Sequence, residues 1–193
     1  MVNAGTLRAD GGGGRIASAL QTGLVETTSA VVSASGGGGA ISVDAGSGAL
    51  YTSGTYAADG LLAGQQGGKV VLTADSIALM GAHVSASGAA GGGTILIGGD
   101  YQGQGDVAHA RETKVGAGVT LQADALARGN GGKVVVWSDQ NTVFGGVVSA
   151  RGGAAGGDGG VLEVSGKETL YFGGPVAQCR HRRCRTTDAR PGA

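Results

Sequence analysis

Three stretches of this chain repeat nearly the same pattern: Val31–Val43 reads VVSASGGGGAISV, His83–Ile97 reads HVSASGAAGGGTILI and Val147–Val164 reads VVSARGGAAGGDGGVLEV. Each has a β-branched run, a few small polar residues, a glycine-rich corner and a second β-branched run. Recurrence at tens of residues is typical of repeat architectures, in which stacked units bury one continuous core. This repetition constrains the fold more than any other feature of the sequence.

The period of the repeat can be counted from its glycines. Gly67–Gly88 aligns with Gly131–Gly152 at an offset of 64 residues, with 11 of 22 positions identical. The second glycines of the Gly-Gly corners are separated by 25, 29, 25, 39 and 28 residues, at Gly14, Gly39, Gly68, Gly93, Gly132 and Gly160. Four of these spacings suit one coil of a large β-solenoid, and about seven coils are expected. The longest spacing contains an insertion, Gly98–Gly118, for which we expect an extra short strand and a protruding loop.

Composition supports the same fold class. Glycine supplies 43 of 193 residues, against a usual share of about 7%, and it lacks the every-third-residue pattern of collagen. Between the glycines lie mainly Val, Ile, Leu, Thr and Ala with little proline, which favours strands. No sustained 3.6-residue apolar period occurs. The prediction is therefore an all-β parallel solenoid with an aliphatic core and essentially no helix.

Strand alternation assigns faces to the repeated residues. Val134 and Val136 should share one face, with Val135 and Trp137 on the other. The alignment places Val70 and Val134 on the same inner face, two coils apart, and likewise Val84 and Val148. Trp137, the only tryptophan, is expected to pack on the outer face or to stand there as a single exposed aromatic, rather than to serve as a platform for a sugar. Lys69 and Lys133 recur after Gly-Gly and should form a solvent-facing ladder that Arg15 continues.

Several motifs resemble a known family. GGKVVVWSD (Gly131–Asp139), Val147–Phe172 and GGDYQGQG (Gly98–Gly105) resemble the filamentous-haemagglutinin-like passengers, or TpsA-type adhesins, of bacterial two-partner secretion. The resemblance spans roughly Gly13 to Gly173 and implies a right-handed parallel β-helix. It also implies export by an outer-membrane transporter, a secreted or surface-displayed product, and adhesion to a receptor or glycan on a host or neighbouring cell. Such repeats carry no catalytic residues in this family, so no catalytic, metal-binding or cofactor-binding residue is predicted.

The chain divides into three parts by composition. Residues 1–10 are expected to be disordered or a partial coil, residues 11–174 to be the solenoid, and residues 175–193 to be a disordered basic tail. The tail holds both prolines, both cysteines and five of the fourteen basic residues, so its net charge is +4 against −4 for residues 1–174. Such an abrupt change suggests a reading-frame shift. We expect a bare solenoid end to self-associate end to end.

The chain also lacks signals that would link it to a membrane. The first residues contain no secretory signal, and the family's amino-terminal transport domain is not recognised. The chain is therefore expected to be a piece of a longer protein, a truncated gene product or the product of a wrongly placed start. No apolar run is long enough to span a membrane.

Other chemistries are less well supported by the residues. Cys179, His181 and Cys184 offer at most three metal ligands, and the basic run around them could attract nucleic acid or lipid head groups, but a disordered tail explains both features. Asp75 and Asp139 occupy matching positions and could act as paired carboxylates in a carbohydrate-active β-helix enzyme. Corner-capping is the commoner role of such residues. His109 and Arg111 are expected in a solvated loop. GGDGGVLEV resembles a calcium-binding repeat, but the required aspartate is replaced by Val161.

We therefore expect a non-enzymatic stalk segment of an adhesin, with no cofactor and no nucleic-acid partner. The first alternative is the stalk of a contact-dependent toxin delivery protein of the same secretion class. The second, of a different class, is a β-helix lyase or hydrolase acting on carbohydrate.

Overall fold

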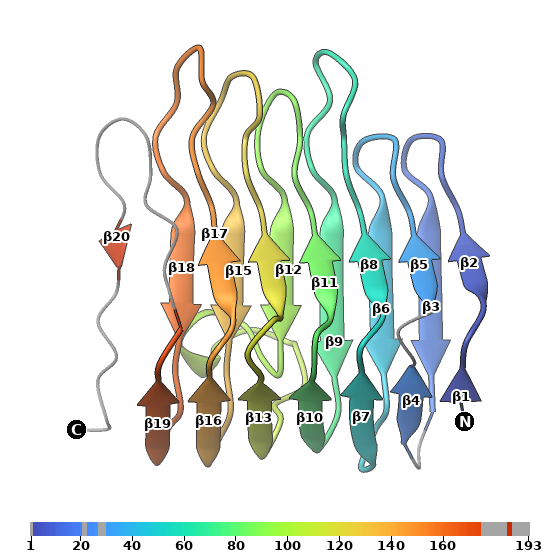
Figure 1. Ribbon diagram of the computed structural model, residues 1–193, viewed down its shortest axis with the longest axis vertical. Coiled ribbons are helices and arrows are strands. Elements are labelled where there is room, and N and C mark those ends of the chain that lie inside the picture. The colour runs from blue at the N-terminus through green and yellow to red at the C-terminus, as the bar shows by residue number, and fades with distance from the viewer. Residues whose placement is uncertain (1, 21–22, 27–29, 175–184, 187–193) are drawn as a thin grey trace.

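The computed structural model describes residues 2–20, 23–26, 30–174 and 185–186, which form three parallel sheets (Figure 1). Sheet A contains β1 (Val2–Asn3), β4 (Leu24–Glu26), β7 (Ala49–Thr52), β10 (Ser76–Leu79), β13 (Glu112–Val115), β16 (Asn141–Phe144) and β19 (Thr169–Phe172). Sheet B contains β2 (Thr6–Arg8), β5 (Val31–Ser33), β8 (Thr55–Ala57), β11 (His83–Ser85), β14 (Thr120–Gln122) and β17 (Val147–Ser149). Sheet C contains β3 (Arg15–Ala19), β6 (Ala40–Asp44), β9 (Lys69–Thr73), β12 (Thr94–Ile97), β15 (Lys133–Val136), β18 (Val161–Val164) and β20 (Arg185–Thr186).

Each coil contributes one strand to each sheet, and each strand pairs in parallel with its counterparts in the neighbouring coils (Figure 1). The described residues make six complete coils, numbered here from the amino terminus, and β19 and β20 begin a seventh. The only helical element among them is a three-residue 3₁₀ turn, η1 (Tyr101–Gly103). The predicted all-β parallel solenoid is therefore confirmed. No helix in the described part of the chain is long and apolar enough to cross a membrane.

The core follows the alternation of the strands. Ile95, Ile97, Val134 and Val136 point inward and are fully buried in one aliphatic cluster that runs through the coils. The core is less purely aliphatic than the sequence indicated, because Tyr56 and Phe144 are among its largest fully buried side chains. The Tyr56 hydroxyl donates to Thr52 Oγ1 at 2.8 Å, so its polar end is satisfied inside the core.

The repeat alignment is correct in register. Val70 pairs with Ile95, which pairs with Val134. Val84 and Val148 lie on either side of Leu121 in the same way. The paired valines thus lie two coils apart on the inner face, as expected from the 64-residue offset.

Truncation of an inner valine should weaken the solenoid measurably. Val134→Ala removes two methyl groups from a fully buried site, and we expect a loss of about 1–3 kcal/mol in the free energy of unfolding, below a typical globular core site because the core is thin. Urea denaturation followed by circular dichroism measures this loss. Val161→Ala is the control, because Val161 lies on β18 in the next coil, where it pairs with Lys133, and its side chain is 40% exposed. Equal effects of the two substitutions would contradict the assignment of faces.

The Gly-Gly corners stack directly on one another. A Cβ built on Gly68, Gly93, Gly132 or Gly160 would lie within 1.9–2.1 Å of the carbonyl oxygen of the corresponding glycine in the preceding coil. That oxygen accepts a backbone hydrogen bond from the residue after the next corner, as from Lys133 N to Gly93 O at 2.8 Å. Glycine is required there because the coils approach too closely for any side chain.

The insertion differs from its prediction. Its strand, β13, is not an extra strand but the regular member of sheet A in the fifth coil, paired with β10 and β16. The additional residues instead form a segment, residues 98–110, that contacts residues of β15 and β18 in sheet C. We call this segment the strap. The loop was predicted to protrude, but it folds back because its own residues find partners on the sheet.

Residues 1–10 were predicted to be disordered or a partial coil, and residues 175–193 to be a disordered tail. Residues 2–3 and 6–8 form β1 and β2, which pair with β4 and β5. Most of the tail, including Cys179, His181 and Cys184, lies outside the described residues. From the tail the structure describes Arg185–Thr186, which form β20 beside β18.

Candidate functional site

Three aspartates each join two neighbouring coils through side-chain hydrogen bonds, an arrangement that we call a bracket. Asp10, Asp59 and Asp124 each follow a strand of sheet B, in the odd-numbered coils. Each carboxylate accepts a hydrogen bond from a serine hydroxyl in the next coil, at 2.5–2.6 Å, and a second from a backbone N–H two residues after that serine, at 2.7–2.8 Å. The solenoid is therefore built from two-coil units, each held by one carboxylate.

The third bracket carries an additional ion pair. Arg151 stands where the first two units have Ser35 and Ser87. Its guanidinium donates to Asp124 Oδ2 from Nε at 2.9 Å and from Nη2 at 2.6 Å. This hydrogen bonding and the carboxylate's charge raise the pKa of Arg151. Because Asp124 is only 2% exposed, its charge requires these partners.

The Asp10 bracket should give stability a specific dependence on pH. Hydrogen bonds from Ser33 Oγ, then Arg8, then the Ser35 N–H lower the pKa of Asp10 from 3.8 to about 2. Because the pKa is lower in the folded state, the stabilisation is full above about pH 4 and is lost as the pH falls towards 2. The melting-temperature difference between wild type and Asp10→Asn should therefore shrink between pH 4 and pH 2. A difference that stays constant over this range would contradict the role of the bracket, and Asp106→Asn, at an exposed site, is the control.

The matching aspartates Asp75 and Asp139 do not lie against each other. Asp75 accepts from Arg111 Nη2 at 3.1 Å, and Asp139 lies 3.1 Å from His109 Nδ1. Each carboxylate thus contacts a basic residue in the strap or directly after it. Part of the insertion predicted to be a solvated loop is therefore held against the corners of the coils. The described residues contain no group of three or more His, Cys, Asp or Glu side chains arranged for a metal ion.

The strap covers the outer face of sheet C in the fourth to sixth coils. It begins after β12, and its Asp100 forms an ion pair with Lys133 on β15. Gln102 N donates to Glu163 Oε2 on β18 at 2.9 Å, and Ser165 Oγ donates to Glu163 Oε1 at 2.7 Å. Leu96 and Val135 point outward, yet they are 1% and 0% exposed. The strap therefore converts part of an outer face into a second buried layer.

Trp137 is held between the sheet and the strap. A Cβ on Gly99 or Gly103 would lie 2.6 Å or 2.4 Å from atoms of the indole ring, and the indole Nε1 donates to Asp139 Oδ1 at 3.3 Å. Its ring centroid lies 5.9 Å from that of His109. Trp137 packs on the outer face, as predicted, and the two glycines let the strap backbone pass directly over it.

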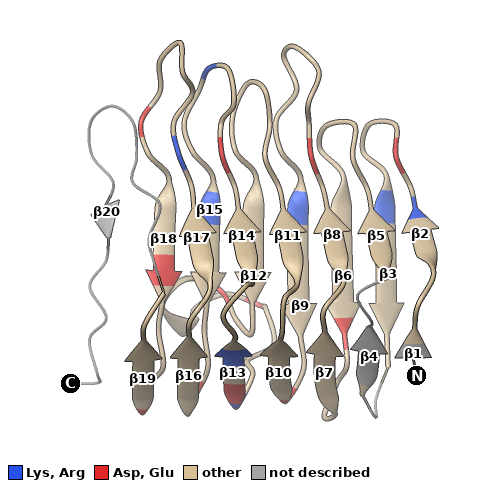
Figure 2. Ribbon diagram, viewed as in Figure 1, with Lys and Arg blue, Asp and Glu red and all other residues tan. Residues whose placement is uncertain are grey.

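The predicted basic ladder exists but is not uniform. Arg15, Lys69 and Lys133 occupy one register position in every second coil, and Figure 2 shows basic residues at the start of β3, β9 and β15. Burial opposes ionisation of Asp100, but hydrogen bonds from Lys133 and the Tyr101 N–H outweigh it, so the pKa of Asp100 is lowered. One member of the ladder thus anchors the strap instead of facing solvent alone.

The outer face of sheet A offers a shallow trough. Tyr51, Ala78, Lys114, Val143 and Tyr171 lie in one row across neighbouring strands. The small side chain of Ala78 leaves a hollow of about 370 Å³ beside Tyr51, and Tyr51 and Tyr171 are 54% and 66% exposed. The lining also includes Ser76, Met80, Glu112 and Asn141. An exposed row with a tyrosine at each end, and with polar groups beside it, is the described surface best suited to contact a partner.

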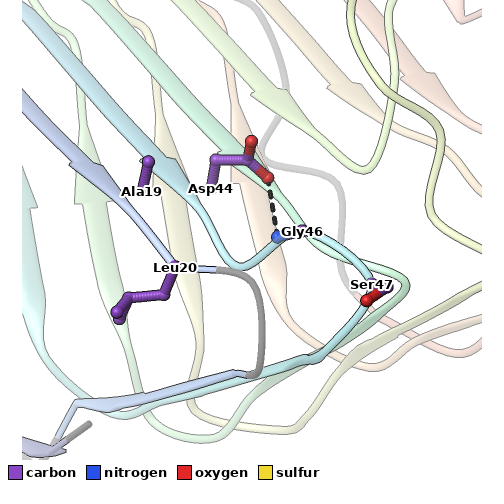
Figure 3. Close-up of a pocket in the computed structure, with 5 residues that line it drawn as sticks. All are labelled: Ala19, Leu20, Asp44, Gly46 and Ser47. Carbon is purple, nitrogen blue, oxygen red and sulfur yellow. Dashed lines mark hydrogen bonds between the residues drawn. The ribbon is translucent and has the colours of Figure 1, made fainter.

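A second hollow lies at the corner between β6 and β7 (Figure 3). Asp44 Oδ1 accepts from Gly46 N at 2.9 Å and from Thr73 Oγ1 at 3.1 Å. The carboxylate therefore holds the corner of the coil, as is usual for aspartate in a turn.

Sequence reasoning missed the brackets and the trough. The signal for the brackets was present, since TLRAD, TYAAD and TLQAD each end on a bracket aspartate. Val135 and Trp137 were correctly placed on the outer face, and two apolar residues there could have indicated a covering segment.

Comparison with known proteins places the fold near a bacterial secretion domain. The HMW1 secretion domain from Haemophilus influenzae is similar in structure, with a TM-score of 0.72 and 27% sequence identity, over 91% of this chain and 46% of that one. The chain therefore spans about half the length of that domain. No protein-family model and no curated protein sequence matches the chain. The structural comparison therefore supports the parallel β-solenoid and a relation to a bacterial secretion domain.

Proposed function

We propose that this chain is a structural and adhesive segment of a bacterial two-partner-secretion adhesin. The observation that carries the proposal is the structural likeness, at 27% identity, to the HMW1 secretion domain over 91% of the chain. The filamentous-haemagglutinin-like motifs support it from the sequence. Its partners would be an outer-membrane transporter and a receptor or glycan on another cell, and its location the bacterial surface or the medium.

The solenoid suits a stalk for a physical reason. Each coil contacts mainly its neighbours, so the stack resists bending through its sheets and extends by adding coils. Its outer faces remain available, and the row of Tyr51, Val143 and Tyr171 is the described surface that we assign to attachment. In this proposal the chain has no catalytic activity.

Attachment of cells to immobilised protein tests the proposal. Beads carrying the full chain should bind epithelial or bacterial cells above the level of uncoated beads. Tyr51→Ala with Tyr171→Ala should reduce attachment, whereas Leu62→Ala, at an exposed loop site, should not. Absence of attachment to both cell types would refute the adhesive part of the proposal. Attachment to bacteria alone would favour the toxin-delivery alternative.

The enzymatic alternative has its own assay. Turnover of pectin, alginate or a glycosaminoglycan that is lost in Asp75→Ala or Asp139→Ala would replace the adhesive proposal. The ion pair of Asp75 with Arg111 and the hydrogen bond between Asp139 and His109 favour a structural role. The neighbouring genes provide an independent check, since a two-partner transporter gene beside this one would support the secretion class.

End-to-end association follows from the same proposal. Phe172 on β19 stacks on Phe144 with 5.3 Å between ring centroids, yet it is 42% exposed. A further coil from another molecule could cover it. Sedimentation velocity over a range of concentrations should show reversible growth, which Phe172→Ser should weaken; a monomer at all concentrations would refute this.

A further inference from the structure

The strap is fixed by residues that come later in the chain. It leaves sheet C after β12 in the fourth coil, and Lys133, which pairs with Asp100, belongs to the fifth coil. Glu163, which accepts the Gln102 N–H, belongs to the sixth coil and lies 61 residues after Gln102. A chain that folds from its amino terminus therefore completes the fourth coil before the strands that carry these partners, β15 and β18, have joined sheet C.

The contact between Gln102 and Glu163 is made where the backbone of the strap is strained. Gln102 has φ of 56°, the only positive φ at a non-glycine position among the described residues. This conformation is unfavourable for a residue with a Cβ and persists only where surrounding contacts hold it. Here it directs the Gln102 N–H at Glu163, a carboxylate that is 5% exposed. The contact between the strap and β18 thus stabilises both a strained backbone and a buried charge.

We propose that the strap is a latch that closes only when β18 has joined sheet C. Before closure, the outward side chains of Leu96 and Val135 face solvent; after closure they are buried, and the fourth, fifth and sixth coils are locked together. The latch thus marks completion of the sixth coil. This inference is independent of any adhesive role.

Trp137 reports the state of the latch directly. It is the only tryptophan in the chain and lies against Gly99 and Gly103 of the strap. Glu163→Ala should shift its emission to longer wavelength and raise its quenching by acrylamide, while the far-ultraviolet circular dichroism stays that of a β protein. Glu163→Gln retains an acceptor oxygen and should keep the wild-type emission. Glu168→Ala, an exposed site nearby, is the matched control.

A pair of glycine variants covers the case in which Glu163→Ala fails to fold. Gly103 and Gly105 both have positive φ, 62° and 85°. A Cβ at Gly103 would lie 2.4 Å from the indole, whereas at Gly105 its nearest neighbour is Asp100 Oδ2 at 3.5 Å. Gly103→Ala should therefore expose Trp137 and Gly105→Ala should not.

Refolding kinetics decide the order of events. On dilution of the full chain from denaturant, circular dichroism should report sheet formation first, and Trp137 fluorescence should then change in a slower phase that Glu163→Ala lacks. If fluorescence and circular dichroism change together in the wild-type chain, closure does not wait for β18 and the proposal is wrong. Wild-type emission in folded Glu163→Ala would also overturn it.

Discussion

Gly132→Ala is expected to cause one of the largest losses of stability among single methyl additions in the central coils. The added Cβ would lie 2.0 Å from Gly93 O and 2.8 Å from Gly93 N and Gly92 C, all backbone atoms that cannot rotate away. The fourth and fifth coils must separate, which strains the hydrogen bond from Lys133 N to Gly93 O. We expect a loss of about 3 kcal/mol or more, and a fall in melting temperature of roughly 10 °C for a chain of this size.

Gly145→Ala is the matched control for this prediction. Gly145 has no positive φ between +20° and +160°, and its Cβ would meet its nearest neighbour, Ala117 N, at an ordinary 3.5 Å. At such a site alanine should be neutral or stabilise by about 0.4–1 kcal/mol, because it restricts the unfolded chain. Differential scanning calorimetry of both variants measures the contrast. Similar melting temperatures would show that the coils are not in the close contact described.

Asp124→Ala should be the most damaging change to a side-chain contact. The substitution leaves Ser149 Oγ and the Arg151 N–H without their acceptor, and both belong to the next coil. Loss of a buried carboxylate with several charge-assisted bonds is expected to cost about 3 kcal/mol. Urea denaturation of the two proteins measures the cost.

Arg151→Ser separates the bracket from its ion pair. Serine is the residue at this position in the other two units, and the Arg151 side chain is 46% exposed, so the change should cost less than about 1 kcal/mol. If Arg151→Ser were as damaging as Asp124→Ala, the ion pair and not the bracket would hold the unit together.

Local sequence features were sufficient to predict the solenoid. A parallel stack requires each coil to repeat the same order of strands and to place glycine wherever two corners touch. Both requirements appear as regular spacings along the chain. The inner valines could be assigned for the same reason, since Val70 and Val134 repeat the environment of one coil in another. Their register needed no knowledge of the rest of the molecule.

The brackets, the trough and the strap were decided by tertiary structure. A bracket joins Asp124 to Ser149, 25 residues away, so its partner is defined only once the coils are stacked. The trough exists because Ala78 comes to lie between Tyr51 and Lys114, from three different coils. The strap had no periodic signal at all. Its course depends on Gln102 meeting Glu163, and on glycines that leave space for Trp137. The repeat determines the stacking of coils because that is a backbone property; the surface arises from side chains that only the folded stack brings together.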